Sequence, residues 1–177
     1  EKYKKLYIDS SKDKNLITEI KDNISKNYIF FSVFRGIASE GIDFSDDNAR
    51  AVICIGIPFA DISENRVKLK IEYLKNLKKE DNNLISGQEW YEADAMTAVN
   101  QSLGRVIRHK NDFGTMLCID ERYKKYEKYF SFWIRDYYEK HKNDDQIKIN
   151  DFLNEQREKF KDIIEENKKS LLQKDLW

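Results

Sequence analysis

Three residues near the middle of the chain have the types and the spacing that suit binding of a phosphate group. The stretch 101–108 reads QSLGRVIR, so Arg105 is four positions after Gln101 and Arg108 is three positions after Arg105. This spacing predicts that all three side chains share one face of a helix. A guanidinium group stays charged and donates paired hydrogen bonds, which match a phosphate oxyanion. Gly104 has no side chain and lets a ligand approach the arginines closely.

A second group of polar residues follows an apolar run. The loop begins at Arg35 and contains Ser39, Glu40, Gly41 and Asp43. Glycine lets the backbone turn tightly and expose its amides, and the polar side chains offer further contacts to a ligand. Taken alone, this loop also fits an ordinary strand-to-helix connection, just as the two arginines also fit a solvated helix surface.

Alternating apolar segments predict the elements that carry these residues. Short β-rich runs predict strands, and apolar residues three and four positions apart predict helices. The predicted strands are 5–8, 28–34, 51–59 and 114–120, and the main predicted helices are 12–25, 66–79, 89–108 and 150–172. This order predicts an α/β fold with a parallel sheet, helices on both faces and a helical C-terminal tail. Ligands of such sheets bind beyond the carboxyl ends of the strands, where we expect both polar segments.

Composition limits the class of protein. The chain has 177 residues, 40% hydrophobic and 36% charged, which predicts a globular domain with a core of its own. Lys plus Arg and Asp plus Glu both number 32, so any nucleic-acid surface must be a local patch. Cys54 and Cys118 lie in apolar runs and are expected to be buried free thiols in a reducing compartment. No apolar run reaches about 18 residues, so we expect no membrane span.

The two polar segments together resemble a known family. FRGIASEGIDFSDDNARAVICIGIPF is similar to motif V and the next strand of superfamily 2 helicases, and VNQSLGRVIRHKNDFGTMLCIDERY is similar to motif VI and its next strand. With the adjoining SGQEWYEADAMTAVNQSLGRVIRH, the pattern resembles XPD-like iron–sulfur DNA helicases, in the branch of the Fanconi anaemia group J and regulator-of-telomere-elongation helicases. The resemblance covers about residues 30 to 135 and is specific, because both motifs occur in the right order.

The resemblance implies a RecA-like second motor lobe over residues 1–135 and a helical extension over 136–177. In this family ATP lies between two such lobes. The positions matched by Arg105 and Arg108 act as arginine fingers, which stabilise charge on the transferring phosphate. The position matched by Gln101 senses or orders the γ-phosphate region.

The same resemblance implies roles for the remaining motif residues. One group couples ATP binding to the DNA groove: Gly41, Asp43 and Gly104. Another group lies toward single-stranded DNA: Arg35, Ser39 and Glu40.

Parts of the family pattern are missing from this sequence. It has no G-x-x-x-x-G-K-[ST] string, no D-E-A-H box and no set of four cysteines. In the family these belong to the first lobe, so we expect the chain to begin after them and to be inactive alone. We also expect its opening strand and motif IV to be truncated. The absent first lobe would mainly hold ATP with magnesium, and the iron–sulfur cluster would lie in that absent part.

By resemblance, the sequence predicts the C-terminal motor lobe of a nuclear, ATP-dependent 5′-to-3′ DNA helicase in DNA repair and genome maintenance. The expected partners are single-stranded DNA, duplex junctions, the first lobe of the same chain and a repair protein bound through the tail. Two alternatives stay open. One is a non-catalytic lobe that docks a partner through its aromatic helical tail, and the other is an RNA-directed helicase with the same motor.

Overall fold

Strands and helices alternate along the chain. The computed structural model describes residues 5–9, 16–22, 28–36, 44, 48–138, 146–161 and 165. The elements are β1 (Lys5–Ile8), α1 (Leu16–Asp22), β2 (Tyr28–Phe31), β3 (Ala51–Ile55), α3 (Asn65–Glu80), α4 (Gly87–Leu103), β4 (Thr115–Ile119), α5 (Tyr123–Tyr126), η2 (Glu127–Tyr129), α6 (Phe132–Arg135) and α7 (Gln146–Lys159). This order confirms the predicted α/β class with parallel strands.

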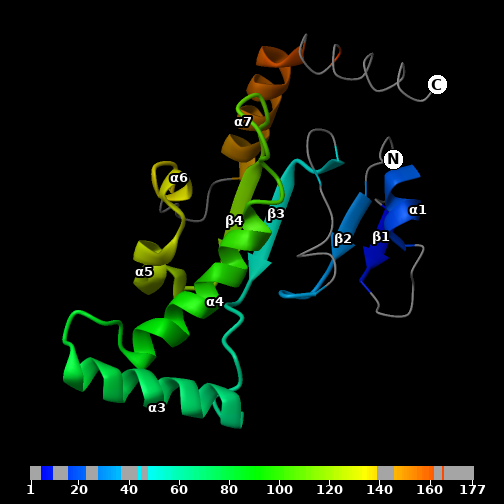
Figure 1. Ribbon diagram of the computed structural model, residues 1–177. Coiled ribbons are helices and arrows are strands. Elements are labelled where there is room, and N and C mark those ends of the chain that lie inside the picture. The colour runs from blue at the N-terminus through cyan, green and yellow to red at the C-terminus, as the bar shows by residue number, and fades with distance from the viewer. Residues whose placement is uncertain are drawn as a thin grey trace, which may run out of the picture.

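Strand pairing forms two parallel pairs in the described part of the chain. β1 pairs with β2, and β3 pairs with β4 in the register Ala51↔Thr115. The sequence predicted one sheet, whereas no ladder joins β2 to β3 among the described residues. A side-chain bond does connect the two regions, because the Tyr28 hydroxyl donates to the backbone carbonyl of Asn48. Figure 1 shows β1, β2 and α1 on one side and β3 and β4 behind α4.

Two strands end earlier than their apolar runs predicted. β2 ends at Phe31 and β3 ends at Ile55, although the apolar runs continue to residues 34 and 59. A left-handed backbone conformation follows each strand, at Arg35 with φ 62° and at Gly56 with φ 76°. Such a residue turns the chain out of the extended direction. Apolar composition marks burial, but it does not fix where the backbone turns.

The hydrophobic core lies between the β3–β4 pair and the helical elements α4, α5, η2 and α6. Helix α4 contributes one continuous buried face, and α5, η2 and α6 add aromatic rings. The buried cluster comprises Cys54, Ile57, Ala95, Met96, Val99, Leu103, Tyr123, Tyr126, Phe130 and Ile134. The alternate residues of β3 point away from this cluster, and Ile53 and Ile55 are exposed. In the described residues, therefore, the packed core lies on one face of β3.

A capping box starts α4 two residues before the predicted helix. The Ser86 hydroxyl accepts a bond from the Glu89 amide (3.1 Å), and the Glu89 carboxylate accepts one from the Ser86 amide (2.7 Å). These reciprocal bonds satisfy backbone donors that a helix start leaves unpaired. Gly87 then lets α4 cross close to α3, because a Cβ there would lie 2.4 Å from the Ile71 carbonyl oxygen.

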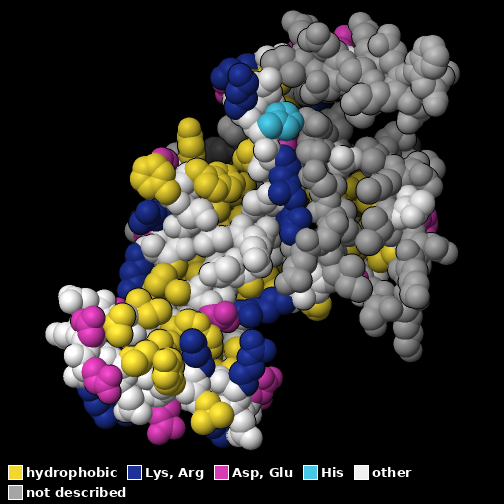
Figure 2. All heavy atoms as spheres, in the orientation of Figure 1, with side chains coloured by type: hydrophobic (Ala, Val, Ile, Leu, Met, Phe, Trp, Pro, Cys, Tyr) yellow, Lys and Arg dark blue, Asp and Glu magenta, His cyan; other side chains and the backbone are white. Residues whose placement is uncertain are grey.

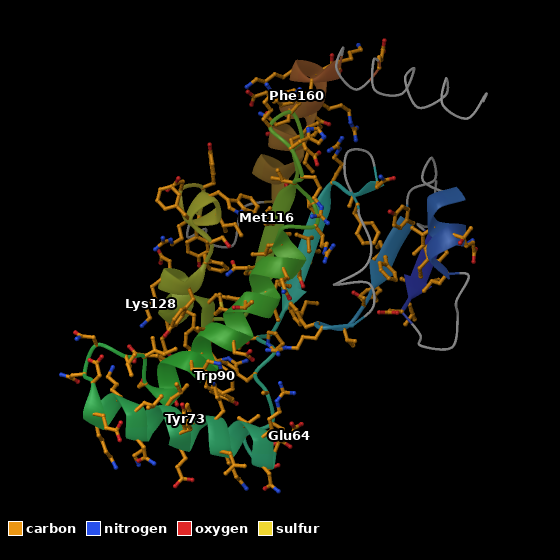
Figure 3. All side chains as sticks on the ribbon, viewed as in Figure 1. Glu64, Tyr73, Trp90, Met116, Lys128 and Phe160 are labelled. Atoms are coloured by element: carbon orange, nitrogen blue, oxygen red, sulfur yellow. The ribbon has the colours of Figure 1, made fainter. Side chains whose placement is uncertain are left out.

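The C-terminal tail contacts the lobe through one aromatic ring just after α7. The helix begins at Gln146, four residues before the predicted start at 150, and residues 162–164 and 166–177 lie outside the described part. Phe160 directly follows α7 and stacks on Phe113 with ring centres 5.8 Å apart (Figure 3). No helix in the described ranges combines the length and the apolar composition needed to cross a membrane.

Gly87→Ala is expected to destabilise the protein, because its methyl group would collide with backbone atoms of α3. We expect a loss of about 1 to 3 kcal/mol in the free energy of unfolding, typical of overpacking. Chemical denaturation measures this loss. The matched control is Gly104→Ala, where the nearest atom to the new Cβ would be 3.3 Å away. Equal stability of the two variants would contradict the close approach of α3 and α4.

The capping box also predicts an acid dependence of stability. Hydrogen bonds from Ser86 and the nearby Lys78 ammonium lower the pKa of Glu89 from 4.5 to about 2. Because the folded-state pKa is depressed, the contribution is complete above pH 4.5 and is lost as pH falls toward 2. Glu89→Gln should therefore flatten the loss of stability in this window, as followed by thermal unfolding at several pH values. Ser86→Ala should flatten it too, and an unchanged acid profile in both variants would refute the assignment.

Candidate functional site

Helix α4 ends before the two predicted arginine fingers. Its last residue is Leu103, whereas the sequence predicted a helix to residue 108. The amides of Arg105 and Val106 donate to carbonyl groups three residues back, at 3.2 and 3.4 Å. Bonds of this type tighten the end of an α-helix and interrupt its regular repeat. The predicted helix is therefore wrong beyond Leu103.

The shorter helix changes the arrangement of the three predicted phosphate ligands. Gln101 is exposed on the last turn of α4, whereas the half-buried Arg105 and the exposed Arg108 lie in the connection to β4. The prediction that all three share one helix face is therefore wrong for the arginines. Gly104 has φ −68° and ψ 2°, which residues other than glycine also adopt. All four residues lie at or just beyond the end of α4. Backbone turns, and not the helical repeat, orient the two arginines.

A buried carboxylate fixes the connection between α4 and β4. The Asp112 side chain is 0% exposed and accepts hydrogen bonds from the Arg50 guanidinium (2.8 Å) and the Arg108 amide (3.2 Å). Arg50 also donates to the Phe113 carbonyl (2.8 Å) and lies over the Phe113 ring, 4.0 Å from its centre. Asp112 thereby joins the residue that precedes β3 to the backbone of one predicted arginine finger.

The sequence reasoning did not identify Arg50 or Asp112. Their only signal is that each is a charged residue directly before or near the start of an apolar strand. Such residues are common on surfaces, and their pairing joins positions 62 residues apart. Only the parallel register of β3 and β4 brings them together.

The arginine connection lies at the amino ends of β3 and β4. Ala51 pairs with Thr115 at the start of both strands, and the Thr115 amide donates to the Arg50 carbonyl (2.9 Å). The sequence predicted that this segment lies beyond the carboxyl ends, and that prediction is wrong. A helix between two parallel strands returns along the sheet, so its end must lie where the second strand begins.

The connection forms a basic stretch on the surface. Arg108, His109 and Lys110 are exposed, and the Asn111 amide donates to the His109 ring (3.3 Å). Figure 2 shows Lys and Arg side chains in a column beside a histidine on this face. This is a local cationic surface in a chain with no net charge.

The other predicted loop is only partly described. Ser39, Glu40, Gly41 and Asp43 lie outside the described residues. Arg35 is described, and its guanidinium donates to the carboxylate (2.6 Å) and the backbone carbonyl (3.1 Å) of Asp94. The start of the loop is therefore attached to the middle of α4.

The two cysteines lie opposite each other in the β3–β4 register and are free thiols. Burial raises the pKa of Cys54 to about 12 and the pKa of Cys118 to about 11, so both stay protonated at neutral pH. An iron–sulfur cluster needs thiolate ligands, and these two thiols do not fit that role. The described residues also contain no group of three or more His, Cys, Asp or Glu side chains that could hold a metal ion.

Comparison with known proteins agrees with the two motifs. The family described as "Helicase C-terminal domain" matches residues 1–137. The chain belongs to this family. A helicase C-terminal domain has a RecA-like fold, which agrees with the parallel pairs and the long α4 described above.

Two relatives show which helicases this C-terminal domain is similar to. "Regulator of telomere elongation helicase 1 homolog" of Aedes aegypti is 45% identical over 130 residues, covering 72% of this chain. The homolog of Drosophila melanogaster is 50% identical over 113 residues, covering 63%. These matches confirm the predicted resemblance to XPD-like superfamily 2 helicases. The chain spans 12% of the length of each relative.

Asp112→Ala should strongly destabilise the domain, because it leaves the Arg50 guanidinium without its buried carboxylate. The expected loss in the free energy of unfolding is about 3 kcal/mol, as for other broken buried ion pairs. Denaturant titration measures this change. Asp120→Ala is the matched control, since it removes an aspartate–arginine pair in which Arg122 is half-exposed. The control should lose much less stability, and similar losses would argue against Asp112 as the anchor.

Proposed function

We propose that this chain is the C-terminal motor lobe of an ATP-dependent DNA helicase. Its arginines act on a nucleotide held mainly by the first lobe. The observation that carries the proposal is the string Q-x-x-G-R-x-x-R in a helicase C-terminal domain, with its connection anchored by the buried Asp112. ATP binding, magnesium and DNA are the requirements that follow for the whole protein.

The proposed chemistry is electrostatic. Arg105 and Arg108 stabilise negative charge that develops on the transferring phosphoryl group, and Gln101 contacts the same region. Donors held in place before the reaction cost no reorganisation when charge develops. The Asp112 carboxylate restrains the connection through the Arg108 backbone amide. This arrangement supports a pre-organised arginine pair.

The remaining predicted residues keep their proposed roles. Gly41, Asp43 and Gly104 couple the nucleotide to the DNA groove. Arg35, Ser39 and Glu40 belong to the loop that lies toward DNA. Magnesium would be held chiefly by residues of the first lobe, and an iron–sulfur cluster would lie outside this chain. The division into a lobe over 1–135 and an extension over 136–177, 5′-to-3′ polarity, a repair role and a nuclear location also belong to this proposal.

The aromatic segment that follows β4, residues 123–138, has a structural role in addition to any docking role. Tyr123, Tyr126 and Phe130 are buried in the core against α4, so most of these rings stabilise the lobe. Phe132 and Tyr137 are exposed and remain open to a partner protein. A repair protein bound through the tail is therefore part of the proposal, whereas a purely non-catalytic docking lobe is its alternative.

Arg105→Ala in the whole helicase tests the proposal. DNA-stimulated ATP hydrolysis should fall on the order of 10³-fold, the scale of a lost arginine finger. Lys110→Ala, a nearby exposed cation, should retain the parent rate, and thermal unfolding should match the parent in both variants. Near-normal hydrolysis by Arg105→Ala would reject the arginine-finger role. Comparing DNA with RNA as the stimulating polymer separates the DNA helicase from the RNA-directed alternative.

A further inference from the structure

Arg35 has an unusual backbone conformation that its side chain helps to hold. It has φ 62°, and no other non-glycine residue in the described part of the chain has a positive φ. This conformation costs about 1 to 2 kcal/mol for a residue with a Cβ, so surrounding contacts must favour it. The guanidinium supplies such contacts, because it bonds both the carboxylate and the main-chain carbonyl of Asp94.

Asp94 lies on the same face of α4 as Gln101. Residues three, four and seven apart share a helix face, so Asp94, Thr97 and Gln101 form one stripe. Seven residues of helix separate the ends of this stripe by about 10 Å along the axis. Thr97 and Gln101 are exposed, whereas Ala95, Met96 and Val99 of the other face are buried. Arg35 therefore attaches the start of the loop to the face of α4 that carries a predicted phosphate ligand.

Helix α4 is well suited to transmit a displacement between these positions. The capping box holds its first turn, and its apolar face packs in the core. Near its end, the Asn100 side chain donates to the Tyr129 carbonyl (2.8 Å) and accepts from the Ser131 amide (3.0 Å). Because α4 is supported along its length, Asp94 and Gln101 keep a fixed spacing, and the Arg35–Asp94 contact acts on the same helix that carries Gln101.

We infer that the Arg35–Asp94 pair links the loop after β2 to the arginine-bearing end of α4, and that Asp94 is a positioning residue for DNA-stimulated ATP hydrolysis. The inference rests on the proposed function, because it assigns the loop to DNA and the end of α4 to the nucleotide. Arg35 then acts by holding the start of the loop against Asp94, so that DNA bound to the loop acts on α4 through this pair.

The exposure of the pair separates this role from a role in stability. The Arg35 and Asp94 side chains are 42% and 32% exposed. Ion pairs with this much solvent contribute at most about 1 kcal/mol, which is similar to the backbone strain at Arg35 and too small to unfold the domain. Alanine also has the highest helix propensity, so Asp94→Ala should keep α4 intact. A defect in this variant would therefore report on coupling.

The test compares DNA-stimulated with basal ATP hydrolysis in the whole helicase. Asp94→Ala should lower the ratio of the two rates about tenfold, within the range of couplings between distant sites. Combining Arg35→Asp with Asp94→Arg should restore most of the ratio, since aspartate tolerates the left-handed backbone at position 35. The matched control is Thr97→Ala on the same face, because the Thr97 hydroxyl bonds the Ala93 carbonyl within α4 (2.8 Å), and this variant should leave the ratio unchanged.

Two results would overturn the inference. One is a parental ratio in Asp94→Ala. The other is a charge exchange that fails to recover activity and instead weakens binding to a single-stranded oligonucleotide, which would assign Arg35 to direct DNA contact. Failure of the proposed function is distinguishable, because it would appear as near-normal hydrolysis in Arg105→Ala whatever the behaviour of Asp94.

Discussion

The buried carboxylate of Asp112 constrains the segment on which the proposed site depends. A charge away from water is tolerated only when hydrogen bonds and an opposite charge surround it. Arg50 supplies the charge, and the Arg108 and Phe113 amides supply further donors. These bonds fix the short connection between α4 and β4 relative to the start of β3. The position of the arginine pair therefore depends on a residue that itself does no chemistry.

Helix α4 connects the parts of the lobe through its two faces. Its buried face packs on β3 and on the aromatic rings that follow β4. Its polar face carries the Arg35–Asp94 pair near the middle and Gln101 at the end. The same element thus organises the core and joins the two polar segments that the sequence shows as separate strings. This double role explains how the start of the loop and the end of α4, which are distant in sequence, are connected through one helix.

Several features were predictable because they depend on local patterns. The strand starts, the positions of α3 and β4, and the parallel α/β class follow from apolar periodicity, and the structure confirms them. The end of α4 had one local signal, because Gly104 is its C-cap and glycine often follows the last residue of a helix, but the sequence analysis assigned this glycine to close approach of a ligand. Tertiary packing accompanies the end of the helix. Val106 is buried, and a Cβ on Gly114 would lie 2.2 Å from the Val106 side chain. A helix continued to residue 108 would not place Val106 there.

The sequence by itself determined the family, the candidate phosphate-binding residues and most of the elements that carry them. These are properties of residue type and short spacing, which local chemistry and motif order reveal. Tertiary structure alone decided that the connection carrying Arg105 and Arg108 lies at the amino ends of β3 and β4, and that Arg35 binds Asp94. Each of these depends on contacts between residues far apart in the chain, and no local pattern encodes the distance between them.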